Sequence, residues 1–577
     1  MRTDSNAPLI EGVELSDLTE QVDEPTSLKQ LENEYQVFNL NLPKAPILIS
    51  LWLGSFLASL DNTVVANMMN VVSEEFQQSE QKQWIATSFL LTNTAFQPLY
   101  GKLSDLIGRK YALMCAHFFF GIGCFSTIFA NNVTQFSIAR AICGAGAGGL
   151  NTISSIVVSD ICSVKDRGFY QGYANLVFAA GQFLGAPFGG FLIDAFGWRF
   201  VFAVQIPMIA VCFVLIWTNV NVKLAHVPEK GRFSFDNLSR IDLGGSLSLI
   251  VVIGGILMLT SDTSTGISDF SIVLITLAAC VVFMLNELYW CKEKIMPFQD
   301  LWGKFGVISL LTLTSSFVAF GEIFRKPVYL QLIQNFKSSD VGVYTIFTSF
   351  STPLASFVTG WILKKTSLNL EYCSYLLIAS SFIFQITSLG LESWFLSNLP
   401  PNTGNGTTTT TATAVQFFLD NTKVYWEVFV VFTNCLGYYG YCTLLVATLV
   451  SIVFSVEKSQ QATFIGLFYL WRSSGNVLGA SLTLTVFEKS LNVSLYRYFK
   501  KIDDLSVYKK LIHDSSLIRK ILDGQMLIDV LNIYKNSIIV AYLPSIFVVV
   551  VSIVISLVFI KATQKHMYDE ELKELGA

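Results

Sequence analysis

Long apolar stretches recur along the chain between residues 46 and 561, with short polar gaps between them. Many approach the ~20 residues that an α-helix needs to cross a ~30 Å hydrocarbon core. Only 14% of the residues are charged, whereas soluble domains average about 25%. A soluble core cannot bury so many apolar stretches. The sequence therefore predicts an all-α polytopic membrane protein, because helices satisfy their own backbone hydrogen bonds in lipid.

The apolar stretches predict fourteen membrane spans. Lys and Arg residues follow the second, fourth, sixth, eighth and tenth spans. Short loops rich in Lys and Arg stay cytosolic, so these gaps and both chain termini are expected in the cytosol. The predicted spans are 46–68, 84–103, 111–130, 135–158, 169–192, 199–219, 242–261, 270–289, 306–332, 341–362, 372–392, 425–450, 461–486 and 537–560.

The spans divide the chain into tails, bundles and loops. The expected segments are an acidic cytosolic tail (1–45), a six-helix bundle (46–219), a cytosolic linker with two inserted helices (220–305), a second six-helix bundle (306–561) with luminal loops at 394–424 and 489–535, and a cytosolic tail (562–577). Sequons on the predicted luminal side make Asn132, Asn405 and Asn492 candidate glycosylation sites.

Composition excludes several partners. The net charge of −4 and the lack of a basic cluster argue against a nucleic-acid partner. The ten cysteines lie singly, mostly inside apolar segments, which indicates packing residues rather than a metal site. We expect no metal and no cofactor, and the expected unit is a monomer in the lipid bilayer.

The gap after the second span carries the strongest local signal, Gly-Lys-Leu-Ser-Asp-Leu-Ile-Gly-Arg-Lys at 101–110. Gly101 and Gly108 are expected to permit a tight turn between neighbouring helices. Asp105 and Arg109 are close enough in sequence to form an ion pair. The plainer interpretation is an ordinary charged turn. In its position between the second and third of many spans, the segment resembles the loop signature of the major facilitator superfamily.

Four further segments resemble the fourteen-helix drug:proton antiporter branch of that family: 60–67, 140–148, 181–190 and 198–207. This resemblance implies two six-helix bundles with two inserted helices between them. It also assigns Gly181, Gly185, Pro187 and Gly189 to an antiporter motif. The chain departs from the family pattern because Ala186 stands before Pro187. The glycine spacing itself is more typical of close helix packing than of a binding site.

Segments 82–100, 159–162, 321–325, 456–461 and 470–474 are similar to the yeast vacuolar basic amino acid transporters. This resemblance implies that histidine, lysine and arginine are moved from the cytosol into the vacuole in exchange for protons. Residues 4–10 (Asp-Ser-Asn-Ala-Pro-Leu-Ile) resemble an acidic dileucine sorting signal. Both features indicate the vacuolar membrane.

Five ionisable side chains fall within predicted spans: Asp61, Arg140, Glu322, Arg325 and Arg472. Ionised groups inside a membrane are costly and usually line a cavity or serve a coupling step. Spans one and nine would be equivalent first helices of the two halves, each presenting a carboxylate to a shared central cavity. We therefore expect these residues to bind substrate or protons. The alternative is structural: Asp61 and Arg140 pair to hold helices together, and Arg472 serves packing.

Other function classes fit less well. A multidrug:proton antiporter has the same fold, and fold does not fix function. Its site tends to be large, apolar and aromatic, which the two buried acids disfavour. A non-transporting nutrient sensor should have a long cytosolic tail, whereas the predicted tails are short. An enzyme is the least expected class, because no soluble segment carries a nucleotide loop, metal cluster or nucleophile constellation.

Overall fold

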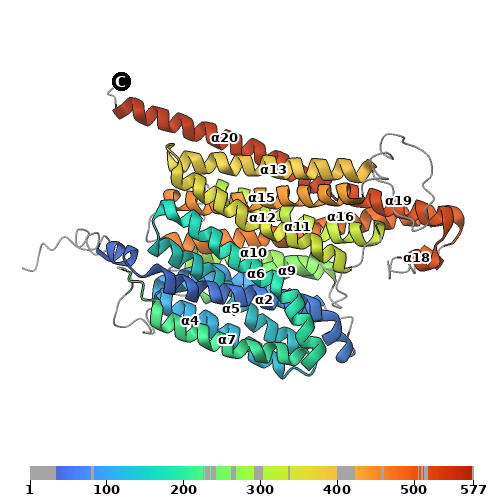
Figure 1. Ribbon diagram of the computed structural model, residues 1–577, viewed down its shortest axis with the longest axis horizontal. Helices are drawn as coiled ribbons and strands as arrows, with labels where there is room; N and C mark the ends of the chain where they lie inside the picture. The colour runs from blue at the N-terminus through green and yellow to red at the C-terminus, as the bar shows by residue number, and fades with distance from the viewer. Residues whose placement is uncertain are drawn as a thin grey trace, which may run out of the picture.

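The structure is a computed structural model of long helices that lie side by side. It describes residues 34–78, 83–224, 227, 234, 242–260, 268–290, 303–334, 338–398, 423–456, 460–504, 506–508, 511 and 518–574. The helices run from one end of the molecule to the other, left to right in Figure 1. Helix α2 begins and helix α20 ends at the same end of the molecule (Figure 1).

Six long helices build the first half of the molecule, and α5 lies at its centre. Glycines of α5 allow its neighbours to approach: a Cβ on Gly146 would lie 2.4 Å from the backbone nitrogen of Phe120 in α4, and one on Gly144 would lie 2.3 Å from the carbonyl oxygen of Phe89 in α3. Only glycine fits at such contacts. The helices are α2 (Lys44–Glu75), α3 (Gln83–Ile107), α4 (Arg109–Ile128), α5 (Val133–Ile161), α6 (Val164–Phe196) and α7 (Trp198–Asn219).

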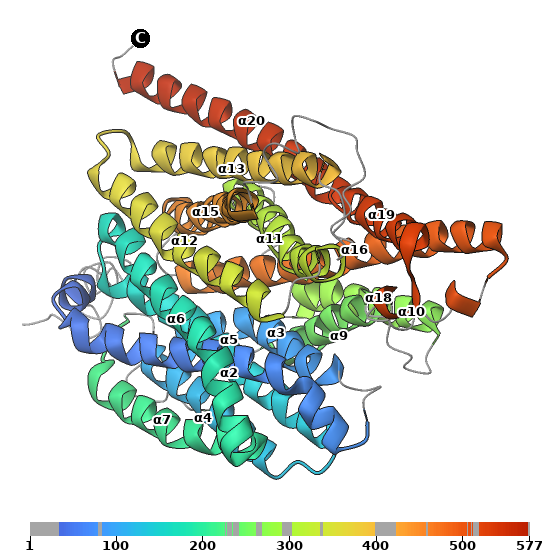
Figure 2. The ribbon, with the colours of Figure 1, turned by 45° about the vertical axis from the view of Figure 1, so that its right-hand side comes forward.

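The second half is built in the same way. Its helices are α11 (Lys304–Val328), α12 (Ser338–Lys365), α13 (Leu370–Asn398), α15 (Lys423–Ser455), α16 (Gln461–Ile502) and α20 (Leu543–Glu574), with the shorter α18 (Ile518–Ile521) and α19 (Gly524–Val540). A π-helical turn at Tyr329–Ile333 extends α11. The two halves meet along α6 against α12 and along α3 against α16. In Figure 2 the blue-to-green first half and the yellow-to-red second half lie beside each other along these helices.

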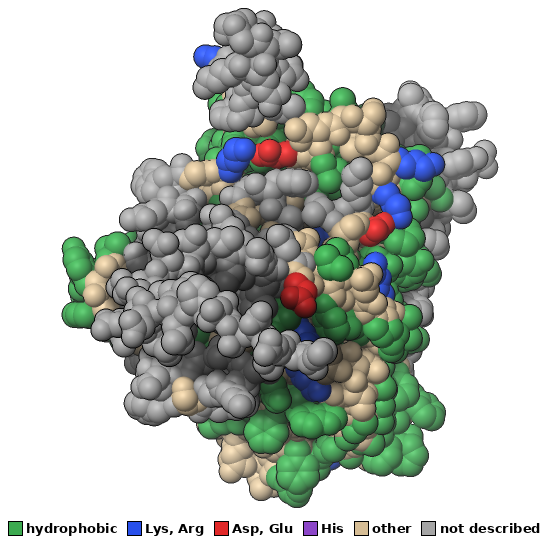
Figure 3. Space-filling view, turned by 90° about the vertical axis from the view of Figure 1, so that its left-hand side faces the viewer, with side chains coloured by type: hydrophobic (Ala, Val, Ile, Leu, Met, Phe, Trp, Pro, Cys, Tyr) green, Lys and Arg blue, Asp and Glu red, His purple; other side chains and the backbone are tan. Residues whose placement is uncertain are grey.

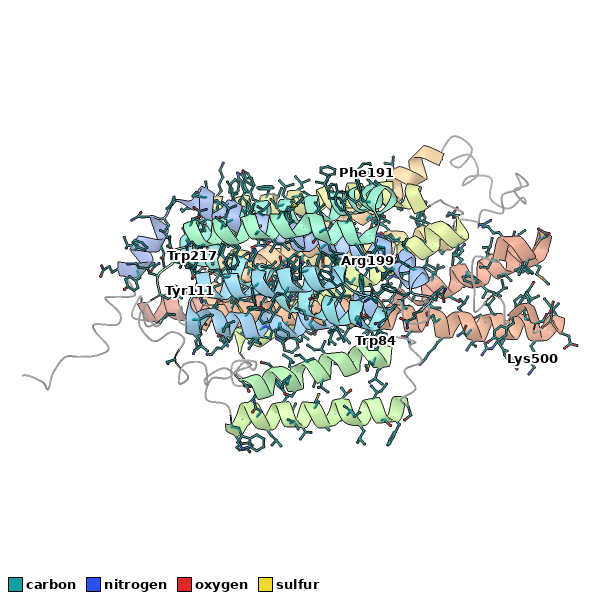
Figure 4. All side chains as sticks on the ribbon, turned by 90° about the horizontal axis from the view of Figure 1, so that it is seen from below. Trp84, Tyr111, Phe191, Arg199, Trp217 and Lys500 are labelled. Atoms are coloured by element: carbon teal, nitrogen blue, oxygen red, sulfur yellow. The ribbon has the colours of Figure 1, made fainter. Side chains whose placement is uncertain are left out.

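Two helices stand outside both halves. The first, α9 (Leu243–Thr260), packs against α3 and α16, and the second, α10 (Asp269–Leu285), packs against α9. Large apolar side chains of α10 are exposed, among them Leu274, Leu277 and Val281. These side chains would face lipid. Figure 4 shows the pair in light green along one margin of the molecule.

Each predicted span overlaps one of these long helices, and the last of them, 537–560, also includes the end of α19 and the turn before α20. Among the described residues, nine helices are long and apolar enough to cross a membrane by length and composition. Four others, α3, α6, α12 and α16, form the contact between the halves. Neighbouring helices shield them from lipid, so they carry polar residues such as Gln97 and Asn175 that lower their hydropathy. The count of fourteen spans remains a prediction.

Much of the segment predicted as a luminal loop at 489–535 is helical, and its luminal placement stays a prediction. Helix α16 continues to Ile502, and α19 begins at Gly524. The extension of α16 buries an apolar stripe spaced by four residues (Leu491, Leu495 and Phe499) and packs against α19. Its exposed face carries Lys489, Asn492, Arg497, Lys500 and Lys501, which hides the helix from a hydropathy window. Trp84 and Arg199 mark one end of the first half, and the extension with Lys500 projects past them (Figure 4).

Those of the basic residues predicted on one side that the structure describes lie at one end of the molecule. At this end Lys364 of α12 pairs with Asp166 of α6 at 2.6 Å, and Lys304 of α11 pairs with Glu371 of α13 at 2.7 Å. Lys and Arg side chains, some with Asp or Glu beside them, are seen on the face that Figure 3 presents. We call this the motif end, since the 101–110 loop lies there. Its placement in the cytosol remains a prediction.

Candidate functional site

An ion pair lies inside the first half. Arg140 of α5 donates from Nη1 to Oδ2 of Asp61 in α2 at 2.6 Å, and both side chains are at most 1% exposed. The Arg140 guanidinium also lies over the ring of Phe89, 4.4 Å from its centroid. Within the described structure, Asp61 Oδ1 and Arg140 Nε have no hydrogen-bond partner. The structural pairing of the two residues is therefore observed, and one carboxylate oxygen stays free for a further proton or donor.

Four charged side chains gather inside the second half; we call them the quartet (Glu322, Arg325, Lys326 and Glu392). Glu322 pairs with Arg325 one turn later in α11. Lys326 pairs with Glu392 of α13 at 2.7 Å and lies 3.7 Å from Glu322. Two acids thus face two bases in a buried site. Mutual pairing is what allows charged groups to persist at such a depth.

Polar groups from three helices complete the quartet. Arg325 donates to the carbonyl of Ala541 at 2.8 Å and to Ser545 at 2.9 Å. Lys326 donates to the side-chain oxygen of Asn434 in α15. The hydroxyl groups of Tyr542 and Ser388 donate to the two oxygens of Glu392, at 3.3 and 3.4 Å.

A small cavity lies beside the quartet, between α11, α13 and α15. Its volume is about 10 Å³, enough for the centre of roughly one water molecule. Its polar lining consists of Glu322, Lys326, Gln385, Ser388, Asn434 and Tyr438. The side chains of the quartet and its neighbours therefore leave almost no empty space around the charged groups in this conformation.

The two carboxylates expected to share a central cavity do not meet. Asp61 contacts α5 of its own half, whereas Glu322 lines the cavity inside the second half. In the described residues each acid has its basic partner within its own half, and a cavity shared by the two acids stays a prediction. What is observed is one buried charged centre in each half.

Arg472 of α16 lies apart from both centres. Its Nε donates to the hydroxyl of Tyr441 at 3.0 Å, and its guanidinium lies 5.9 Å from the ring centroids of Tyr441 and Tyr469. The next residue, Ser473, donates to Gln97 of α3 at 3.0 Å. Arg472 thus sits beside a contact between the halves, and its substrate role remains a prediction.

Sequence reasoning missed Lys326 and Glu392. Lys326 directly follows Arg325 but falls near the end of a predicted span, where a lysine can extend its ammonium group to the interface. Glu392 is the last residue of the predicted span 372–392, so it was not counted among the membrane-embedded acids. The signal that could have revealed it is the continued apolar sequence Ser-Trp-Phe-Leu directly after it. Helix α13 extends to Asn398 and carries Glu392 inside the bundle.

The 101–110 loop forms the ion pair that its sequence predicts. Arg109 donates to Asp105 at 2.6 Å and to Asp160 of α5 at 2.8 Å. Gly108 has a φ of +92° and forms the turn between α3 and α4. Gly101 does not belong to the turn: it lies inside α3, where a Cβ would approach the carbonyl oxygen of Ala462 to 2.7 Å. Its lack of a side chain therefore permits close contact with α16 of the other half.

One family model, described as Major Facilitator Superfamily, matches residues 51–480. The chain belongs to this superfamily. The human organic anion transporter MFSD10 has a similar structure, with a TM-score of 0.50 over 88% of this chain and 99% of that one. At 12% sequence identity this likeness shows the fold alone.

Two curated relatives within the superfamily are similar over most of their length. The Saccharomyces cerevisiae protein named Vacuolar basic amino acid transporter 1 is 52% identical over 545 residues, which cover 93% of this chain and 96% of that protein. The Schizosaccharomyces pombe protein named Multidrug resistance protein fnx1 is 32% identical over 482 residues, covering 82% and 85%. Membership in a transporter superfamily also agrees with the expectation that the chain is not an enzyme.

The glycines assigned to the antiporter motif of this superfamily pack against α2. A Cβ on Gly181, Gly185 or Gly189 would come within 2.6–2.8 Å of Phe56, Leu60 or Val64. Gly185 lies against the residue that precedes Asp61, so the motif sets the position of the first charged centre. Pro187 lies inside α6, and its side chain is outside the described residues. These three glycines therefore allow α6 to pack closely against α2.

The three sequons fall in different settings. Asn132 caps α5, since its Oδ1 accepts from the backbone nitrogen of Gln135 at 2.7 Å. Asn492 is exposed on α16, and Asn405 lies outside the described residues. Glycosylation at all three positions remains a prediction.

Proposed function

We propose that this superfamily member moves histidine, lysine and arginine from the cytosol into the vacuole, as a monomer and in exchange for protons. The observation that carries the proposal is the 52% identity, over nearly the whole of both chains, to a protein named Vacuolar basic amino acid transporter 1. Two chains this similar along their full length are expected to share the residues of their transport pathway. The vacuolar membrane and cytosolic termini belong to the same proposal.

The buried charges support a cationic substrate. Each half holds a carboxylate paired with a base, and both pairs lie among side chains that exclude water. Electrostatic attraction is strong in such a low-dielectric interior. A substrate with a cationic side chain can take the place of the basic partner beside a carboxylate, which a neutral substrate cannot do.

Asp61 is the proposed proton site. Its Oδ2 is held by Arg140, and its Oδ1 has no hydrogen-bond partner among the described residues. A proton arriving from the acidic lumen can be bound at Oδ1 while Oδ2 keeps its contact with Arg140. Release of that proton to the near-neutral cytosol resets the carrier. Arg140 then serves to position the carboxylate, and Glu322 of the quartet contributes to binding the substrate.

A multidrug transporter is the second candidate, favoured by the 32% identity to a protein named Multidrug resistance protein fnx1. The lining argues against it, because the cavity beside the quartet is bordered by charged and polar side chains such as Glu322 and Lys326. A polyspecific drug site needs a large apolar volume. A nutrient sensor on the same fold is the third candidate.

Uptake into sealed vacuolar vesicles tests the proposal. Vesicles from cells that express the chain should accumulate labelled lysine, histidine and arginine when a proton gradient is present. Collapse of the gradient with a protonophore should stop accumulation. Vesicles without the chain are the control. Uptake of drug-like cations with no uptake of basic amino acids would favour the second candidate, and no transport of either would favour a sensor.

A further inference from the structure

Two lysine–glutamate pairs connect α11 to α13, and Lys326 with Glu392 is one of them. Lys304 of α11 and Glu371 of α13 pair at 2.7 Å at the motif end, and Lys326 and Glu392 pair at 2.7 Å inside the bundle. The outer side chains are 47% and 21% exposed, whereas the inner ones are 14% and 4% exposed. The outer pair already provides a bridge between α11 and α13. The inner pair bears a desolvation cost that a structural bridge does not require.

The surroundings of Lys326 would suit a bound ammonium ion. Its Nζ contacts carboxylates of Glu392 and Glu322 and the amide oxygen of Asn434. These acceptors come from three helices, α11, α13 and α15. The cavity beside them is too small for an amino acid side chain, and Lys326 is one of the residues that line it. Its ammonium group on a four-carbon stem is chemically the same as the end of free lysine.

We propose that Lys326 is a tethered substitute for the substrate: in the empty carrier its ammonium occupies the position that the side-chain cation of a basic amino acid takes, and Glu392 is the carboxylate that receives that cation. This inference rests on the proposed function. When substrate binds, its cation pairs with Glu392, and Lys326 keeps Asn434 and Glu322 as partners. When substrate leaves, Lys326 returns and Glu392 is never left unpaired in the membrane.

The arrangement makes an unusual prediction, since removal of a buried cation should strengthen binding. If the tethered ammonium vacates the site in about one molecule in ten, its loss tightens apparent lysine affinity about tenfold. Lys326→Ala should therefore lower the Kd for lysine of the purified full-length protein. Lys326→Gln, which keeps a hydrogen-bond donor without the charge, should act in the same direction. Glu392→Gln should weaken binding tenfold or more.

The outer pair supplies matched controls. Lys304→Ala and Glu371→Gln break an equally short bridge between the same helices, and they should lower the melting temperature without changing the Kd for lysine. A merely structural role for the inner pair predicts that its variants behave in the same way. Wild-type affinity in Lys326→Ala, Lys326→Gln and Glu392→Gln would overturn the proposal. Weaker binding in both Lys326 variants would also overturn it, because removal of a group that competes with the substrate cannot weaken substrate binding.

A small amine separates this inference from the proposed function. In Lys326→Ala the missing part of the side chain corresponds to n-propylamine. This amine at millimolar concentration should raise the melting temperature of Lys326→Ala and leave the wild type and Lys304→Ala unchanged. That result supports the ammonium site even if labelled basic amino acids are not transported, in which case the proposed function alone fails. No effect of the amine on Lys326→Ala would count against the site.

Discussion

Replacement of Asp61 by asparagine tests the proposed proton site most directly. The amide fills nearly the same space as the carboxylate, and its oxygen can still accept from Arg140, which lies 2.6 Å from Asp61 in the wild type. The charge is lost, so the fully buried Arg140 guanidinium loses its counter-ion. Breaking a buried pair on one side typically costs roughly 3–5 kcal/mol. We expect Asp61→Asn to abolish proton-driven lysine uptake and to lower the stability of the carrier.

A second substitution separates coupling from stability. Asp61→Asn combined with Arg140→Gln leaves two neutral side chains that can hydrogen bond to each other, so most of the lost stability should return. Proton coupling should not return, because neither side chain can carry an exchangeable charge. The melting temperature of the purified proteins measures the first effect. Delivery to the vacuole is checked by fractionation.

The assay is accumulation of labelled lysine by vacuolar vesicles with and without a proton gradient. Both variants should equilibrate lysine at most, whereas the wild type concentrates it. If either variant reaches the vacuole and still concentrates lysine in response to the gradient, Asp61 does not bind the transported proton. A variant that fails only through misfolding would instead show full activity once the neutral pair restores its stability.

Four further predictions follow from other sites. Arg140→Ala should reduce lysine uptake more than Arg140→Lys, since lysine keeps the charge that Asp61 needs but not the guanidinium fork; equal, near-normal uptake would remove Arg140 from the mechanism. Lys365→Cys should be labelled from outside intact vacuoles by an impermeant maleimide, and labelling only after permeabilisation would reverse the predicted orientation. Gly185→Ala should destabilise the protein by about 1–3 kcal/mol, because its Cβ would meet the Leu60 carbonyl oxygen at 2.8 Å, whereas Gly190→Ala, with open space around it, should change the melting temperature little. The hydrogen bond from Arg199 lowers the pKa of Glu75 from its ordinary 4.5. This exposed pair therefore adds well under about 1 kcal/mol of stability above pH 4.5, and that contribution is lost as the pH falls through the lowered pKa. Below the lowered pKa, wild type and Glu75→Gln should have the same melting temperature.

The sequence predicted the parts of the fold that hydropathy reports. Each span lies on a helix because a lipid-facing helix must be apolar over its whole length. Hydropathy did not predict the extension of α16 beyond residue 486, because this part of the helix is not apolar all round. Only one face of that extension is buried, where Leu491 and Leu495 pack toward α19. Its average hydropathy therefore resembles that of a loop.

From the sequence, residues of the candidate site could be predicted only where a single charged residue lies well inside an apolar span. Asp61 and Arg140 stand out because each is a lone charge inside an apolar span. Lys326 and Glu392 lie near the predicted ends of their spans, where charges are common. Their pairing depends on how α11 packs against α13, which no local pattern in the sequence encodes.

The neutrality of the two charged centres has an electrical consequence. The quartet carries two positive and two negative groups, and the pair of Asp61 and Arg140 also sums to zero. On the proposed assignments, one substrate side-chain cation leaves the carrier at +1, and one proton on Asp61 leaves it at +1 as well. Both half-cycles then move the same charge in opposite directions. Exchange of one for one is electroneutral, so accumulation follows the pH difference and gains nothing from the membrane potential, which would otherwise contribute about 2.3 kcal/mol per charge for each 100 mV.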